Sequence, residues 1–100
     1  MLTPRMRRKI RREMSVGKPI VRIGKHGPSK ETLSELDRQL ERAEVVKVRI
    51  LKTALGEEVT KAIAEESAQS TRSNIVEVRG HTFVLYRKKE RALKIRDGRR

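Results

Sequence analysis

Two glycines separated by two residues form the most suggestive chemical motif in the chain, Gly24-Lys25-His26-Gly27. The motif stands before a helix that Ser29 can cap, and a helix N-terminus offers free backbone N–H groups and a positive dipole end. Glycines allow a ligand to approach the backbone closely, and Lys25 adds a point charge. The motif therefore predicts contact with a phosphate group, although such glycines also form ordinary tight turns between a strand and a helix.

Basic side chains surround this loop and continue into both ends of the chain. Residues 1–30 carry ten basic side chains and one acid, a net charge of +9, and residues 85–100 carry eight and two, a net charge of +6. Residues 31–84 carry eight basic and ten acidic side chains, so the excess of +13 lies at the ends. Charge of this size favours a polyanionic partner, although the arginines of the first helix could serve solubility alone. The basic residues expected to contact it, besides the loop, are Arg5, Arg7, Arg8, Arg11, Arg12, Lys18, Arg22, Lys30, Lys47, Arg49, Arg79, Arg87, Lys88 and Lys89.

Residues that could carry other chemistry do not form a matching set. His26 and His81 are the only histidines and cysteine is absent, so no metal-ligand set is expected. The two carboxylate pairs at 57–58 and 65–66 lack a matching nucleophile, and a solvated helix face explains them. The sequence therefore predicts no catalytic residue, no metal, no cofactor and no small-molecule substrate.

Composition narrows the class of protein further. An anionic membrane would also attract this charge, but interfacial helices need bulky anchors, and the chain has no Trp and one Phe. Neither a signal peptide nor a transmembrane stretch is visible, so we expect a cytoplasmic protein that does not contact membranes. One Asn, two Gln and 39% charged residues favour a hyperthermophilic source, and we expect an archaeal one.

Hydrophobic periodicity predicts the elements that position these side chains. A first helix is expected to begin at Thr3-Pro4 and to end at Gly17, docking by a narrow apolar edge and exposing a cationic back. The residues of that edge are Leu2, Met6, Ile10 and Met14. Two further helices are expected, one after Ser29 and one over 57–70, together with strands over 19–23, 45–51, 74–79 and 82–86.

The order of these elements, a helix and then β-α-β-α-β-β, predicts an α/β fold. It is expected to be a two-layer sandwich with a four-stranded mixed sheet, covered by helices on one face. Alternation assigns these residues to the helix-covered face: Val21, Ile23, Val46, Val48, Ile50, Val76 and Val78. The other face is expected to be basic and without bulky aromatic residues, and to carry Arg22, Lys47, Arg49, Glu77 and Arg79. Residues 1–87 are expected to form a single domain and 88–100 a basic tail.

Three segments together resemble the CRM domain, a family named for chloroplast RNA splicing and ribosome maturation, with YhbY-like single-domain members in bacteria and archaea. The segments are the loop at 24–27, the second strand at 46–50 and the closing hairpin Gly-His-Thr-Phe-Val-Leu-Tyr-Arg at 80–87. The resemblance covers about residues 3–90. Pro28-Ser29 departs from the family pattern, which often has an apolar residue and then Thr after the second glycine.

The resemblance implies a fold like the C-terminal domain of translation initiation factor three, and RNA binding in which Gly24, Lys25, His26 and Gly27 meet the RNA. In prokaryotes it implies association with ribosomal RNA of the large subunit and neighbouring ribosomal proteins, as an assembly factor or a stably bound component. An archaeal architectural protein that coats DNA or RNA is the alternative. One Tyr, one Phe and no Trp leave little to stack on bases, so we expect backbone contacts to dominate.

Overall fold

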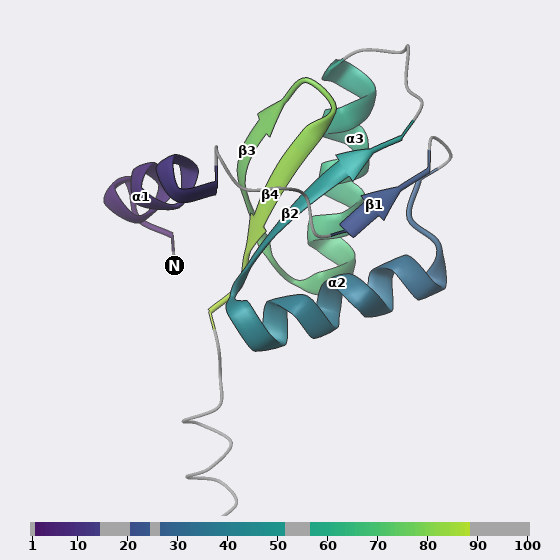
Figure 1. The fold of residues 1–100 in the computed structure, drawn as a ribbon, viewed down its shortest axis with the longest axis horizontal. Coiled ribbons are helices and arrows are strands. Elements are labelled where there is room, and N and C mark those ends of the chain that lie inside the picture. The colour runs from purple at the N-terminus through teal and green to yellow at the C-terminus, as the bar shows by residue number, and fades with distance from the viewer. Residues whose placement is uncertain (1, 15–20, 25–26, 52–56, 89–100) are drawn as a thin grey trace, which may run out of the picture.

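Three helices and a four-stranded sheet make up the computed structural model, which describes residues 2–14, 21–24, 27–51 and 57–88 (Figure 1). The helices are α1 (Pro4–Met14), α2 (Lys30–Ala43) and α3 (Glu57–Thr71), and the strands are β1 (Val21–Ile23), β2 (Val45–Ile50), β3 (Asn74–Arg79) and β4 (Thr82–Tyr86). The strand order is β1-β2-β4-β3, with β1 parallel to β2 and the other pairs antiparallel. The predicted element order and mixed sheet are therefore confirmed, whereas Gly17, Ile20 and nearly all of the basic tail lie outside the described residues.

Capping side chains fix where the first two helices begin, as the sequence predicts. Thr3 Oγ1 accepts a hydrogen bond from a backbone N–H of the first turn of α1 at 3.1 Å. Ser29 Oγ accepts from the Thr32 N–H at 3.1 Å, so α2 begins directly after the glycine loop. α2 ends where Glu44 takes a left-handed backbone (φ 69°) and donates its N–H to the Leu40 carbonyl.

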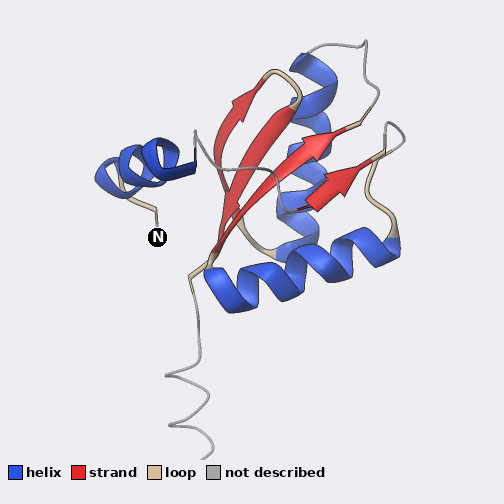
Figure 2. Ribbon diagram, in the orientation of Figure 1, coloured by secondary structure: helices blue, strands red, loops and turns tan. Residues whose placement is uncertain are grey.

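The main core lies between α2, α3 and one face of the sheet (Figure 2). α3 contributes the small buried side chains Ala64, Ser67 and Ala68, as its sequence predicts. The apolar members of this core are Val21, Ile23, Leu36, Leu40, Val46, Val48, Ile50, Ile63, Ala64, Ala68, Phe83 and Leu85. Their burial fixes which face of β1, β2 and β4 points into the core, and therefore which side chains these strands present on the opposite face.

α1 packs on the opposite face of the sheet, against β3, where it covers a second apolar cluster (Figure 1). The cluster consists of Ile10, Val76, Val84 and Tyr86, with Leu2, Met6, Met14 and Val45 packed against them. The predicted docking of the first helix by its apolar edge is confirmed. The prediction that helices cover only one face, and that the other face is basic without aromatic residues, is wrong for the part under α1, where Tyr86 is buried.

A β-bulge in β3 explains why Val76 does not follow the predicted alternation. The pattern assigns Val76 to the face of α2 and α3, but the side chain packs under α1. Ile75 and Glu77 pair with consecutive residues of β4, so Val76 is an extra residue that shifts the alternation by one position. The Arg7 guanidinium donates to the carbonyl oxygens of Ile75 (2.8 Å) and Val76 (3.1 Å). α1 therefore supplies hydrogen-bond donors to two backbone carbonyls at the bulge.

Candidate nucleic-acid interface

A row of polar side chains crosses the part of the sheet that α1 leaves exposed. The strand register pairs Arg22 with Arg49, Arg49 with Thr82, and Thr82 with Arg79, so the row runs over β1, β2, β4 and β3 in that order. Directly opposed residues point to the same side of a sheet, which here is the side of α1. The three arginines are exposed and Thr82 is partly buried. We call these four residues the arginine row.

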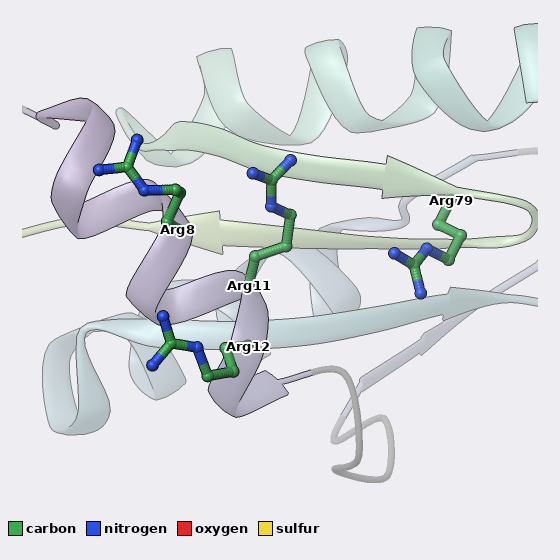
Figure 3. Close-up of a pocket in the computed structure, with 4 residues that line it drawn as sticks. All are labelled: Arg8, Arg11, Arg12 and Arg79. Carbon is green, nitrogen blue, oxygen red and sulfur yellow. The ribbon is translucent and has the colours of Figure 1, made fainter.

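The arginine row meets α1 in an open cleft lined by four arginines (Figure 3). Arg8, Arg11 and Arg12 project from α1, and Arg79 extends toward the helix from the end of β3. Residues three and four apart are neighbours on a helix surface, which is why the three arginines of α1 emerge together. The cleft has a volume of about 420 Å³. We call it the arginine cleft.

Glu77 holds two arginines of the cleft in place. Its Oε1 lies 3.6 Å from Arg11 Nε, and its Oε2 lies 3.4 Å from Arg79 Nε. The Glu77 side chain is 15% exposed, whereas those of Arg11 and Arg79 are 46% and 70% exposed. The ion pairs therefore orient both arginines through Nε while much of each guanidinium faces solvent. The four arginines that line the cleft make it a cationic site suited to phosphate oxygens, which arginine binds in a bidentate manner.

The described ends of the glycine loop, Gly24 and Gly27, follow directly after the Arg22 end of the row. The Gly27 N–H donates to the Gly24 carbonyl at 3.1 Å and closes a tight turn. Gly27 has φ +101°, so its backbone requires glycine. Gly24 has no such φ, and a Cβ there would meet nothing within 4 Å apart from its chain neighbours. Nothing in the described part of the protein demands glycine at position 24, whereas a ligand lying against the backbone would demand it.

A carboxylate lies on the α3 side of this loop. A Cβ built on Gly27 would be 3.8 Å from Glu66 Oε1. A phosphate approaching from that side would be repelled, while Arg22 on the sheet side and Lys30 at the start of α2 are exposed and attractive. The favoured approach to the loop is therefore from the sheet face, which also carries the arginine row.

Three basic residues predicted to contact a partner bind within the protein. Arg7 holds the bulge, and Lys47 Nζ donates to the carbonyl of Met14, the last residue of α1, at 2.8 Å. Arg87 donates to Asp37 Oδ1 and to a carbonyl at the end of α3, both at 2.7 Å. These contacts hold α1 and the end of β4 in place. Arg5, Lys30 and Lys88 are exposed and belong neither to the lining of the cleft nor to the row, and Lys18, Lys25, His26 and Lys89 lie outside the described residues.

Both aromatic residues of the chain are buried, Phe83 at 0% exposure and Tyr86 at 7%. Burial, and then the negative charge of Glu44, raises the pKa of the Tyr86 hydroxyl above its ordinary value. Because the sequence contains no other Phe or Tyr and no Trp, the protein offers no aromatic face of this kind to an unstacked base.

Sequence reasoning missed the parts that Glu77 and Thr82 play in this surface. Alternation placed Glu77 on the correct face, but its position between Arg11 and Arg79 depends on where α1 docks, which no pattern in the sequence predicts. Thr82 was assigned only to the closing hairpin. Counting outward from the turn at 80–81 places Thr82 opposite Arg79, and this signal could have identified it.

Two other kinds of site are absent from the described residues. No group of three or more His, Asp or Glu side chains there lies close enough together to hold a metal ion. None of the helices in that part of the chain has both the length and the apolar character needed to cross a membrane.

A family model, two relatives and a solved structure are similar to this chain. Residues 2–87 match the family described as CRS1 / YhbY (CRM) domain. The chain is 37% identical over 89 residues to "Probable RNA-binding protein MJ0652" of Methanocaldococcus jannaschii, an alignment that covers 89% of this chain and 66% of that protein. It is 32% identical over 87 residues to "Probable RNA-binding protein YqeI" of Bacillus subtilis, covering 87% and 88%. The solution structure of the hypothetical protein SAV1595 of Staphylococcus aureus, described provisionally as RNA-binding, matches with a TM-score of 0.76, 34% identity and coverage of 89% and 91%.

Proposed function

Because the chain belongs to the CRS1/YhbY (CRM) domain family, we propose that it binds RNA, and that this RNA is ribosomal RNA of the large subunit. It acts there beside neighbouring ribosomal proteins in the cytoplasm, as an assembly factor or a stably bound component, and catalyses no reaction. The names of the relatives in Methanocaldococcus jannaschii and Bacillus subtilis support RNA as the ligand. These relatives come from an archaeon and a bacterium, so an archaeal source stays a prediction.

The arginine row and the arginine cleft carry this proposal. Together they gather six arginines on one side of the molecule: Arg8, Arg11, Arg12, Arg22, Arg49 and Arg79. Phosphate contacts fix the register of a protein on a nucleic acid without reading its sequence, and arginine is well suited to make them. Because Phe83 and Tyr86 are buried and the sequence has no Trp, affinity comes chiefly from phosphates and from the shape of the RNA.

The remaining contacts extend this surface at both of its ends. The glycine loop, with Gly24, Lys25, His26 and Gly27, holds a phosphate at the β1 end, and Lys18 and Lys30 contact the same RNA. Arg5, Lys88 and Lys89 at the chain ends make further contacts outside the cleft. In this account Arg7, Lys47 and Arg87 act chiefly by holding the helices and strands that carry the other cations.

Sedimentation with ribosomal subunits tests the proposal. Purified protein is mixed with large and small subunits of the source organism and centrifuged through gradients of increasing salt. We expect the protein to travel with the large subunit or its precursors, and the triple variant Arg8→Gln, Arg11→Gln, Arg12→Gln to be released at lower salt. Lys61→Gln is the matched control, because Lys61 is exposed on α3, on the opposite side of the sheet. Equal binding to small subunits contradicts the choice of RNA, and equal binding to duplex DNA at matched salt favours the DNA-coating alternative.

A further inference from the structure

The arginine row places its charge in two groups with an uncharged residue between them. Arg22 and Arg49 are direct neighbours on β1 and β2, and Arg79 on β3 joins the three arginines of the cleft. Thr82 on β4 separates the groups. Strands lie about 4.8 Å apart, so the Cα atoms of Arg49 and Arg79 are about 10 Å apart and those of Arg22 and Arg79 about 14 Å apart. Two separated cationic groups on a broad face match the phosphate backbones of two nucleic-acid strands better than the backbone of a single strand.

A double helix suits this face better than a single strand does. Single strands gain much of their affinity from bases stacked on aromatic side chains, and both aromatic residues of this chain are buried. A duplex keeps its bases stacked internally and presents two rows of phosphates. The A-form helix of RNA also has a wide and shallow minor groove that displays ribose 2′-hydroxyls, whereas the minor groove of B-DNA is narrow.

The hydroxyl of Thr82 is positioned to read that groove. Thr82 Oγ1 donates its proton to the Arg79 carbonyl at 2.9 Å, so the oxygen that faces a partner can only accept a hydrogen bond. A ribose 2′-OH supplies a donor, and deoxyribose supplies none. Thr82 also lines a small hollow of about 40 Å³ together with Arg11, Lys47 and Glu77, which is enough space for a hydroxyl group.

We propose that the arginine row seats the minor groove of an RNA double helix, and that Thr82 distinguishes ribose from deoxyribose. The two cationic groups bind phosphates of the two strands, and Thr82 Oγ1 accepts a hydrogen bond from a 2′-OH between them. This inference rests on the proposed function, since it specifies the form of the RNA that is bound.

Binding measurements on three probes of one sequence test the inference: an RNA duplex of about 16 base pairs, the matching DNA duplex and the single RNA strand. At matched salt we expect the RNA duplex to bind most tightly. Thr82→Val should weaken RNA duplex binding about fivefold, the effect of one lost hydrogen bond, and should leave DNA duplex binding unchanged. Thr82→Ser keeps the hydroxyl, so this variant should retain the preference for the RNA duplex over the DNA duplex. The double variant Arg22→Gln, Arg49→Gln should lower the salt slope for the RNA duplex by about two, whereas Arg42→Gln, an exposed control on α2, should not.

Each contrary result has a distinct meaning. Single-stranded RNA binding as tightly as the duplex overturns the duplex seat and leaves RNA binding intact. Equal losses on RNA and DNA duplexes for Thr82→Val overturn the role of its hydroxyl, and melting curves of Thr82→Val and Thr82→Ser exclude loss of the fold as the cause. If none of the RNA probes binds, the proposed function fails as well.

Discussion

Arg22 and Arg49 lie directly opposite each other on the parallel strands β1 and β2, with both side chains exposed on the same face. Like charges at opposed positions destabilise a sheet, by an amount similar to the roughly 0.2–1 kcal/mol that favourable pairs contribute. Within the described residues, neither arginine has a carboxylate partner. The sheet therefore retains a repulsion that a bound phosphate would relieve.

Replacing one member of this pair should change stability and binding in opposite directions. We expect Arg49→Thr to raise the free energy of unfolding by about 0.5 kcal/mol, because it removes the repulsion and introduces a residue that favours strands. The same variant should bind RNA more weakly, with a salt slope lower by about one. Urea denaturation and RNA titration of one preparation measure both effects. A variant that loses stability and binds RNA as well as the wild type does would show that Arg49 serves the fold instead.

The two glycines of the loop should respond differently to alanine. Gly27→Ala should lower the free energy of unfolding by about 1 kcal/mol or more, because its φ of +101° strains any residue with a Cβ. Gly24→Ala should leave stability within about 0.5 kcal/mol of the wild type, because its Cβ would occupy open space. It should nevertheless weaken RNA binding by blocking close approach to the backbone. Full affinity of a folded Gly24→Ala protein would mean that the loop only makes the turn.

Arg7 should matter to stability more than any neighbouring arginine of α1. Its guanidinium serves two carbonyls at the bulge, and loss of both charged hydrogen bonds should cost about 1–3 kcal/mol. Arg7→Met keeps the apolar stem and removes the donors. Arg5→Met, on an exposed position of the same helix, is the control and should change stability by less than about 0.5 kcal/mol. Equal denaturation midpoints for the two variants would show that the hydrogen bonds of Arg7 at the bulge do not stabilise the protein.

Alkaline pH should destabilise the protein through Tyr86. Its pKa is raised in the folded state by burial first and by Glu44 second, so the neutral hydroxyl is favoured in the fold. The associated stability is fully present below the unfolded pKa of about 10 and is lost as the pH rises through the folded pKa. Tyr86 is the only tyrosine, so phenolate absorbance follows it directly. We expect a higher titration midpoint in native than in denatured protein, and a weaker alkaline loss of stability in Tyr86→Phe. Identical midpoints would contradict this expectation.

Local sequence patterns were sufficient to predict most of the fold. The caps at Thr3 and Ser29, the period of the helices and the alternation in β2 depend on neighbours in sequence, and each is confirmed. The bulge at Val76 could not be predicted from local patterns. The side chain that donates hydrogen bonds to its carbonyls is Arg7, 69 residues away in the chain. The basic face is smaller than expected because α1 covers part of that side of the sheet.

The candidate site was predictable in its residue types and less so in its arrangement. Charge clustering pointed to the arginines of the first helix and strand alternation to Arg49 and Arg79. Neither pattern could reveal that Arg79 meets the arginines of α1. That meeting depends on where α1 docks. Charge by itself also could not separate Arg7, Lys47 and Arg87, whose head groups bind carbonyls, from arginines that face solvent.

The salt dependence of RNA binding tests the central claim of phosphate contact most directly. For the wild-type protein, the logarithm of the binding constant for an RNA duplex should fall linearly with the logarithm of salt, by about 10³-fold or more between 50 and 200 mM if six or more phosphates are neutralised. The variant with Arg8, Arg11, Arg12 and Arg79 all changed to Gln should show a slope lower by about four, provided that its melting curve shows a folded protein. A shallow wild-type slope, or an unchanged slope in the folded variant, would contradict the account.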